Sequence, residues 1–140
     1  MIKQIFNKDI LYAIVIYSSF QKDGISFFTP KNFSQQLGYM NRPKGHKVKP
    51  HMHSVHERSI YQSQEVLFIK SGKLKIDFFD TEGEFLESLI LNSGDIILLA
   101  NGGHGIEWLE DGEVIEVKQG PYSECDDKIE FDTIGNKANL

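Results

Sequence analysis

The sequence predicts an all-β protein whose short antiparallel strands form a barrel or a sandwich. From Ile10 onward, β-branched and aromatic stretches are separated by turns rich in Gly, Asn, Asp and Lys. No long segment keeps a helical period. Ten such short stretches in 140 residues are typical of a barrel or a sandwich, in which each strand buries at least one face.

Each expected strand is an apolar run bounded by turn residues. The ten ranges are 11–17, 25–29, 36–41, 47–53, 64–70, 73–79, 85–91, 95–99, 105–109 and 114–118. Lys and Asp alternate with Leu, Ile and Phe in residues 73–78, as expected of a strand with one face on water and one on a core. Little helix is expected, at most one turn at 31–37 after Pro30.

Two short turns predict hairpins in the middle of the chain. Ser71 and Gly72 separate the strand ending at Lys70 from the strand at 73–79, and residues 80–83 separate that strand from 85–91. Connections this tight favour antiparallel pairing of the strands that they join. We therefore expect the three strands to pair consecutively.

The length suits one domain spanning residues 1–140, because a globule of this size buries roughly two-thirds of the surface of its unfolded chain. The core is expected at about 37–122, preceded by N-terminal strands at 10–29 and followed by a polar tail at 123–140. Residues 135–140 contain little that could pack on a core, so a loose end is expected there.

The charge balance argues against a nucleic-acid partner. The chain has 15 Lys and Arg against 20 Asp and Glu, for a net charge of -5, whereas phosphate binding needs clustered cations. One basic run is present, at Arg42, Lys44, Lys47 and Lys49. It is either a solvated face or a surface that meets an anionic ligand.

The cysteine count and the hydropathy pattern favour a cytoplasmic protein without a membrane segment. The single cysteine, Cys125, cannot form an internal disulfide, and the acidic residues beside it disfavour a reactive thiolate. The apolar run at 10–17 is much shorter than the ~20 residues that a membrane helix needs. A buried strand explains that run more simply.

Histidines are concentrated in one short stretch. Three of the five fall within six positions, at His51, His53 and His56. If residues 47–53 form a strand, His51 and His53 point to the same face and can present two imidazoles to one ion. Such a pair also arises by chance in a chain with five histidines, so its surroundings must support the interpretation.

The residues around the pair resemble the first motif of the cupin superfamily. Gly45 is followed after five residues by His51 and His53, and Glu65 is followed after six residues by Gly72. Eleven residues separate His53 from Glu65 where the motif has three or four, which predicts a longer loop.

The longer loop leaves the acidic ligand open between two residues. Glu57 has the motif's spacing from the histidines, whereas Glu65 begins an apolar run and would be held on a strand. We favour Glu65. His56 and His46 are either spare ligands or surface histidines.

Residues 94–104 resemble the second cupin motif. Gly94 opens it, Ala100 stands where proline is usual, and His104 arrives one residue early. Taken alone, His104 is either a loop histidine or a ligand. Together with the first motif, the resemblance favours a ligand.

The resemblance implies a single-domain double-stranded β-helix, the jelly-roll barrel of cupins, with one divalent transition metal ion. The implied ligands are His51, His53, Glu65 and His104. Three imidazoles and a carboxylate suit Fe, Mn, Ni, Co or Zn, and an octahedral ion would keep two positions for water, substrate or oxygen. The ligand set does not choose among these metals.

Further side chains could orient a ligand or move a proton. Arg42 precedes the first motif, and Glu116 and Lys118 share one face of the strand at 114–118. Trp108 and Tyr39 could supply apolar walls. A solvated loop, an exposed strand face or core packing would equally explain these residues.

The cupin resemblance covers residues 37–122, and within it the stretches 64–72, 94–104 and 116–122 are similar to small single-domain bacterial cupins found among surface-polysaccharide and nucleotide-sugar genes. The resemblance implies a sugar or sugar-nucleotide ligand and isomerase or epimerase chemistry. An Fe(II)-dependent dioxygenase and a non-enzymatic sugar-binding or sensing module are the alternatives. We also expect a homodimer, formed through an exposed apolar edge at 11–17.

Overall fold

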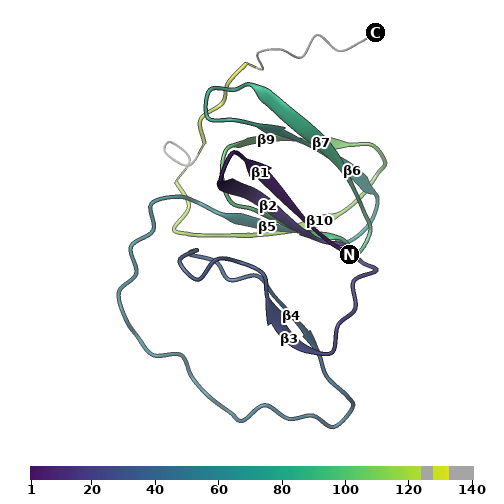
Figure 1. The fold of residues 1–140 in the computed structure, drawn as a ribbon, viewed down its shortest axis with the longest axis vertical. Coiled ribbons are helices and arrows are strands. Elements are labelled where there is room, and N and C mark those ends of the chain that lie inside the picture. The colour runs from purple at the N-terminus through teal and green to yellow at the C-terminus, as the bar shows by residue number, and fades with distance from the viewer. Residues whose placement is uncertain (124–127, 133–140) are drawn as a thin grey trace. The chain divides into compact units, whose positions relative to one another are not determined.

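The computed structural model describes residues 1–123 and 128–132, and in these residues the protein is all-β, as predicted (Figure 1). The strands are β1 (Ile2–Asn7), β2 (Ile10–Ile16), β3 (Gly24–Phe27), β4 (Gly38–Asn41), β5 (Glu65–Ile69), β6 (Lys73–Phe79), β7 (Phe85–Asn92), β8 (Ile96–Leu99), β9 (Gly103–Trp108) and β10 (Val114–Lys118). The helical turn expected at 31–37 is absent. None of the described segments is a helix that is long and apolar enough to cross a membrane.

The chain divides into two compact units, each described here by itself. The main unit comprises Met1–Phe20 and Ser63–Leu140, and the second unit comprises Gln21–Gln62. Strands β3 and β4 belong to the second unit, and the other strands belong to the main unit. The expectations for Cys125 and for the loose end at 135–140 lie outside the described residues.

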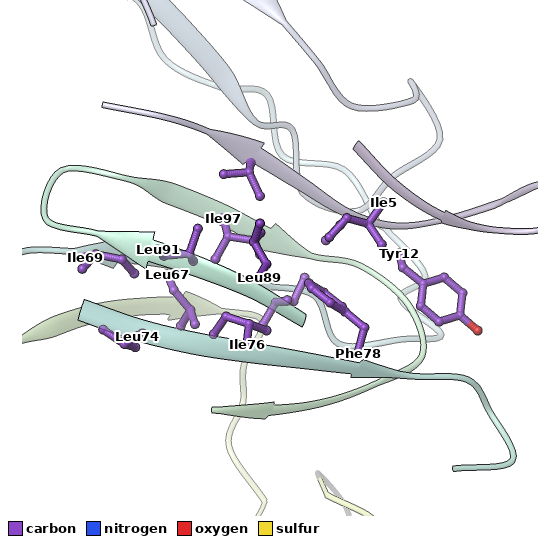
Figure 2. Packing of buried hydrophobic residues seen from close by; sticks show 13 residues of the cluster. Ile5, Tyr12, Leu67, Ile69, Leu74, Ile76, Phe78, Leu89, Leu91 and Ile97 are labelled. Atoms are coloured by element: carbon purple, nitrogen blue, oxygen red, sulfur yellow. The ribbon is translucent and has the colours of Figure 1, made fainter. Parts of the chain in front are cut away.

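Two antiparallel sheets build the main unit. The larger has the strand order β1-β2-β8-β5-β10 and the smaller has the order β7-β6-β9. Among the described residues, neither sheet closes on itself. Both sheets contribute side chains to one hydrophobic core, which is shown in Figure 2.

Strand β6 shows how the sequence pattern builds that core. Leu74, Ile76 and Phe78 are fully buried, while Lys75 and Asp77 between them are only partly covered. This confirms the alternation predicted for residues 73–78. Alternate side chains point to opposite faces of a strand, so a period of two places Leu74, Ile76 and Phe78 together in the core.

The edge predicted at residues 11–17 is wrong, because β2 lies inside the larger sheet. It pairs with β1 on one side and with β8 on the other, and side chains on both of its faces are buried, for example Ala13 and Ile14. Strand β1 was not expected, since Lys3 and Gln4 interrupt its apolar residues. The edges of this sheet are β1 and β10.

Only one of the two predicted hairpins forms. Strands β6 and β7 pair as expected, but β5 pairs with β8 and β10, and β6 pairs with β7 and β9. The turn at Ser71 and Gly72 therefore carries the chain from one sheet to the other. The backbone N–H groups of Lys70 and Ser71 donate to the carbonyl of Glu113, the residue before β10. A short turn alone does not distinguish a hairpin from such a corner.

The second unit contains the β3–β4 hairpin and a long segment without strands. Gln36 closes the hairpin loop, because its side-chain amide donates to the carbonyl oxygens of Pro30 and Phe33. The strand predicted at 47–53 is absent, and residues 42–64 contain no strand. This stretch is mostly polar and contains Pro43 and Pro50, which lack a backbone N–H donor, so it offers little apolar surface and fewer backbone hydrogen bonds to hold it in a sheet.

Candidate functional site

Glu65 and His104 lie together although they come from different sheets. Glu65 begins β5 and His104 is the second residue of β9, and Oε2 of the carboxylate is 3.6 Å from Nε2 of the imidazole. Along β5, Glu65 shares its face with Leu67 and Ile69, which are both buried in the core. His104 likewise shares its face with Ile106, which packs against the core. The polar pair therefore continues the inner faces of both sheets at one end of the core.

The surroundings of Glu65 favour its ionised form. Interaction with the His104 ring lowers the pKa of the Glu65 carboxyl, burial opposes this by raising it, and the charge of Lys118 lowers it further. Lys118 is the direct cross-strand neighbour of Glu65 in the β10–β5 pairing. A carboxylate that is ionised and only partly exposed is suited to binding a cation.

Strand β10 presents two candidate residues on the inner face of the larger sheet. The Lys118 amino group lies 3.3 Å from the Glu116 carboxylate, which agrees with the face predicted for them. Val114 shares this face and packs against the core. The Lys118 nitrogen also lies 5.4 Å from the centroid of the Tyr122 ring. A carboxylate and an aromatic ring thus lie beside Lys118, which is itself the cross-strand neighbour of Glu65.

Two glutamines next to this group were missed by the sequence analysis. Gln64 is buried, and its backbone N–H donates to the side-chain oxygen of Gln119 at 2.6 Å. This bond links the residue before Glu65 to the residue after Lys118. No motif signals such a contact, because it depends on the pairing of β5 with β10.

His51 and His53 lie together in the second unit. Their ring centroids are 5.5 Å apart with the planes at 75°, although no strand holds them. Nδ1 of His51 donates a hydrogen bond to the Lys49 carbonyl at 2.9 Å, which leaves Nε2 with a lone pair. Both imidazoles are exposed.

The remaining candidates are divided between the two units. Trp108, at the end of β9 in the main unit, is about half exposed. The others lie in the second unit, and they are Tyr39, Arg42, His46, His56 and Glu57. Across the described ranges, no group of three or more His, Cys, Asp and Glu side chains is arranged to hold a metal ion. The structure thus gives two pairs of potential ligands, each within its own unit.

Comparisons with protein-family models, with curated proteins and with solved structures give no match. Function is therefore inferred from the residues. Imidazole and carboxylate are both good ligands for first-row divalent ions, so Glu65 and His104 fit one part of a metal site. His51 and His53 offer two more imidazole ligands.

Proposed function

We propose that this is a metal-binding protein of the cupin type, in which His51, His53, Glu65 and His104 bind one divalent transition metal ion. The main support is the 3.6 Å approach of Glu65 to His104 from facing sheets. A partly covered carboxylate beside an imidazole at the end of a hydrophobic core is costly to desolvate, and perturbed groups of this kind are concentrated at functional sites.

The proposal does not need a complete site before the metal binds. Residues 42–64, which include His51 and His53, contain no strand. Metal binding can order such a segment, because the free energy of coordination offsets the entropy lost on ordering. A jelly-roll barrel is the fold that we propose for the metal-bound protein.

We further propose that the ligand is a small sugar or sugar-nucleotide of surface-polysaccharide biosynthesis, and that it is isomerised or epimerised. A bound divalent ion supplies polarisation of a carbonyl oxygen. Glu116 would accept a proton from the carbon beside that carbonyl. Its return to the opposite face of the same carbon gives the epimer, and its return to the former carbonyl carbon, while the hydroxyl proton passes to the former carbonyl oxygen, gives the isomer, so atoms and charge balance. Lys118 and Arg42 are suited to orienting anionic or hydroxyl groups of the ligand.

Elemental analysis of the purified protein after dialysis without chelator tests the metal site. We expect near-stoichiometric metal in the wild type and its loss in His51→Ala, Glu65→Gln and His104→Ala. His46→Ala is the matched control, because it removes an exposed imidazole that is not a proposed ligand. A well-folded wild type that takes up no metal on reconstitution would refute the proposal.

Turnover of nucleotide-activated sugars, followed by NMR, tests the reaction. The metal-loaded protein should form an isomer that chelator abolishes, and Glu116→Gln should slow it by about 10²- to 10⁴-fold. Oxygen uptake by the anaerobically Fe(II)-loaded protein would instead identify a dioxygenase. Binding that leaves every sugar chemically unchanged would indicate a sugar-binding or sensing module.

A further inference from the structure

One aromatic side chain from the C-terminal segment packs against the main unit. The Phe131 ring lies 5.6 Å from the ring of Phe79 at an interplanar angle of 78°. A Cβ at Gly103 would lie 2.6 Å from Cζ of Phe131, and a Cβ at Gly83 would lie 3.2 Å from its Cδ2. The ring therefore occupies a seat formed by Phe79 and the two glycines. In Figure 1 this segment runs beside the turn that joins β6 to β7.

The two glycines of the seat are explained differently. Gly83 has φ of 87°, so its backbone conformation itself favours glycine. Gly103 is not among the residues with positive φ, so its φ does not require glycine. A side chain there is disfavoured by steric contact. The atoms within 3 Å of its Cβ position all belong to Phe131. The lack of a side chain at Gly103, the residue before His104, thus leaves the space that the Phe131 ring occupies.

This seat lies next to the proposed ligand His104. Gly103 pairs with Phe79 in the ladder between β9 and β6, and the next pair along is His104 with Phe78. Strand β9 is an edge strand, with a ladder on one side only. The end of an edge strand opens at low free energy unless other contacts hold it. Phe131 provides such a contact at the pair adjacent to His104.

A second residue of the same segment has an electrostatic effect on the candidate site. After His104 and Lys118, the charge of Lys128 also lowers the pKa of Glu65. The segment that carries Phe131 therefore also brings a positive charge within electrostatic range of the carboxylate.

We propose that residues 128–132 form a strap that holds the start of β9 against β6, with Phe131 as its anchor, and that Phe131 thereby acts as a positioning residue for His104. The consequence for metal binding rests on the proposed function, whereas the effect on β9 does not. The sequence signal is an aromatic residue within a polar tail, and no motif includes it.

Amide hydrogen exchange of the full-length protein, measured residue by residue with NMR, tests the strap directly. Phe131→Ala should accelerate exchange in the ladder shared by residues 103–106 and β6 by about 2- to 10-fold, the range expected for one aromatic pair. Phe85→Ala is the matched control, because Phe85 contacts the Phe79 ring at a centroid distance of 6.0 Å and contributes none of the three atoms nearest a Cβ at Gly103, which belong to Phe131 and Phe79. Unchanged exchange in Phe131→Ala, or an equal change in both variants, would overturn the proposal.

Two substitutions that flank His104 provide an independent test. Gly103→Ala should displace the ring and reproduce the Phe131→Ala exchange pattern. Gly105→Ala should not, because its Cβ would meet only Phe79, at an ordinary distance of 3.7 Å. Matching exchange patterns for Gly103→Ala and Gly105→Ala would contradict the strap.

The metal-loaded protein provides the functional readout. Phe131→Ala should lower metal affinity by the same 2- to 10-fold range, about the effect of one aromatic pair, while Phe85→Ala leaves it unchanged. A wild type without metal would refute the proposed function but would leave the exchange result as evidence for the strap. Normal metal affinity in Phe131→Ala, despite faster exchange, would overturn the positioning role.

Discussion

At the scale of single residues, Asp95 shows how a buried charge is accommodated in this fold. Its side chain is almost fully buried in the turn before β8. The carboxylate accepts hydrogen bonds from the backbone N–H groups of Ser18 and Asn92, both at 2.8 Å. These bonds tie the chain after β2 to the turn between β7 and β8, and they compensate the burial of the carboxylate.

We expect Asp95→Ala to lower the free energy of unfolding by about 1–3 kcal/mol per donor left unsatisfied in the interior. Asp80→Ala is the matched control, because Asp80 also accepts two backbone N–H groups, from Glu82 and Glu84, but in an exposed turn where water can replace it. Urea denaturation checks both variants. An equal loss in the free energy of unfolding in the two variants would show that burial of the accepting carboxylate does not determine the loss.

At the scale of elements, the corner between β5 and β6 depends on close backbone contact. Gly72 has φ of 83°, and a Cβ there would lie 2.6 Å from the carbonyl oxygen of Asp111. That oxygen belongs to the turn between β9 and β10. Two turns from different parts of the chain therefore meet backbone to backbone, and a side chain at Gly72 would separate them.

Gly72→Ala should destabilise the protein more than Gly45→Ala does. Both glycines have nearly the same φ, 83° and 86°, but nothing lies within 4 Å of a Cβ at Gly45. Left-handed strain is common to the two variants, at roughly 1–2 kcal/mol, so the difference measures the backbone contact. We expect that difference to be about 1–3 kcal/mol in chemical denaturation. A difference of zero would contradict the steric explanation.

At the scale of the whole molecule, the two edge strands of the larger sheet differ in the side chains that they carry. Edge strand β1 carries Gln4 and also Lys3, which forms an ion pair with Glu87 at 2.8 Å. Edge strand β10 exposes Ile115 and Val117, which are 51% and 58% accessible. Charged and polar residues protect an edge from pairing, whereas exposed apolar residues favour it. The predicted homodimer is therefore better placed at β10 than at residues 11–17.

The register of that pairing follows from charge. The Lys70 N–H donates to the Glu113 carbonyl, so by alternation the polar backbone groups of Val114 and Glu116 point away from β5. A two-fold antiparallel pairing centred on Glu116 would oppose two carboxylates. A pairing centred on Val117 instead places Glu116 opposite Lys118 of the partner subunit. We therefore expect the register that is centred on Val117.

Val117→Lys should convert the homodimer to a monomer at micromolar concentration, since it would place two like charges opposite each other at the two-fold axis. Gln4→Lys, at the exposed outer face of the other edge, should leave the dimer intact. Sedimentation velocity distinguishes the two states. A wild type that sediments as a monomer, or a Val117→Lys variant that remains dimeric, would refute this interface.

Much of the strand pattern was predictable because it is local. The alternation in residues 73–78 predicted β6 and its buried face, and the turn at 80–83 predicted the β6–β7 hairpin. Strand β1 and the absence of a strand at 47–53 were not predictable in this way. Polar residues in β1 are supported by pairing with β2, whereas residues 47–53 pair with neither β3 nor β4, the two strands of their own unit.

The residues of the candidate site also differ in whether the sequence could predict them. The resemblance to the two cupin motifs, together with the apolar run that begins at Glu65, selected Glu65 and His104, and they lie 3.6 Å apart. Spacing could not provide Gln64, Gln119 or Phe131, because each contacts its neighbours only after distant segments have come together. The metal, the ligand and the reaction stay predictions.

The sequence by itself determined most of the strands of the main unit and which faces of strands such as β6 are apolar, because backbone alternation and turn chemistry act over a few residues. Only the tertiary structure decided which strands are neighbours, that the turn at Gly72 joins two sheets, and that β2 is interior while β10 is an edge. Strand order depends on which apolar faces can be buried together, and that is a property of the whole chain.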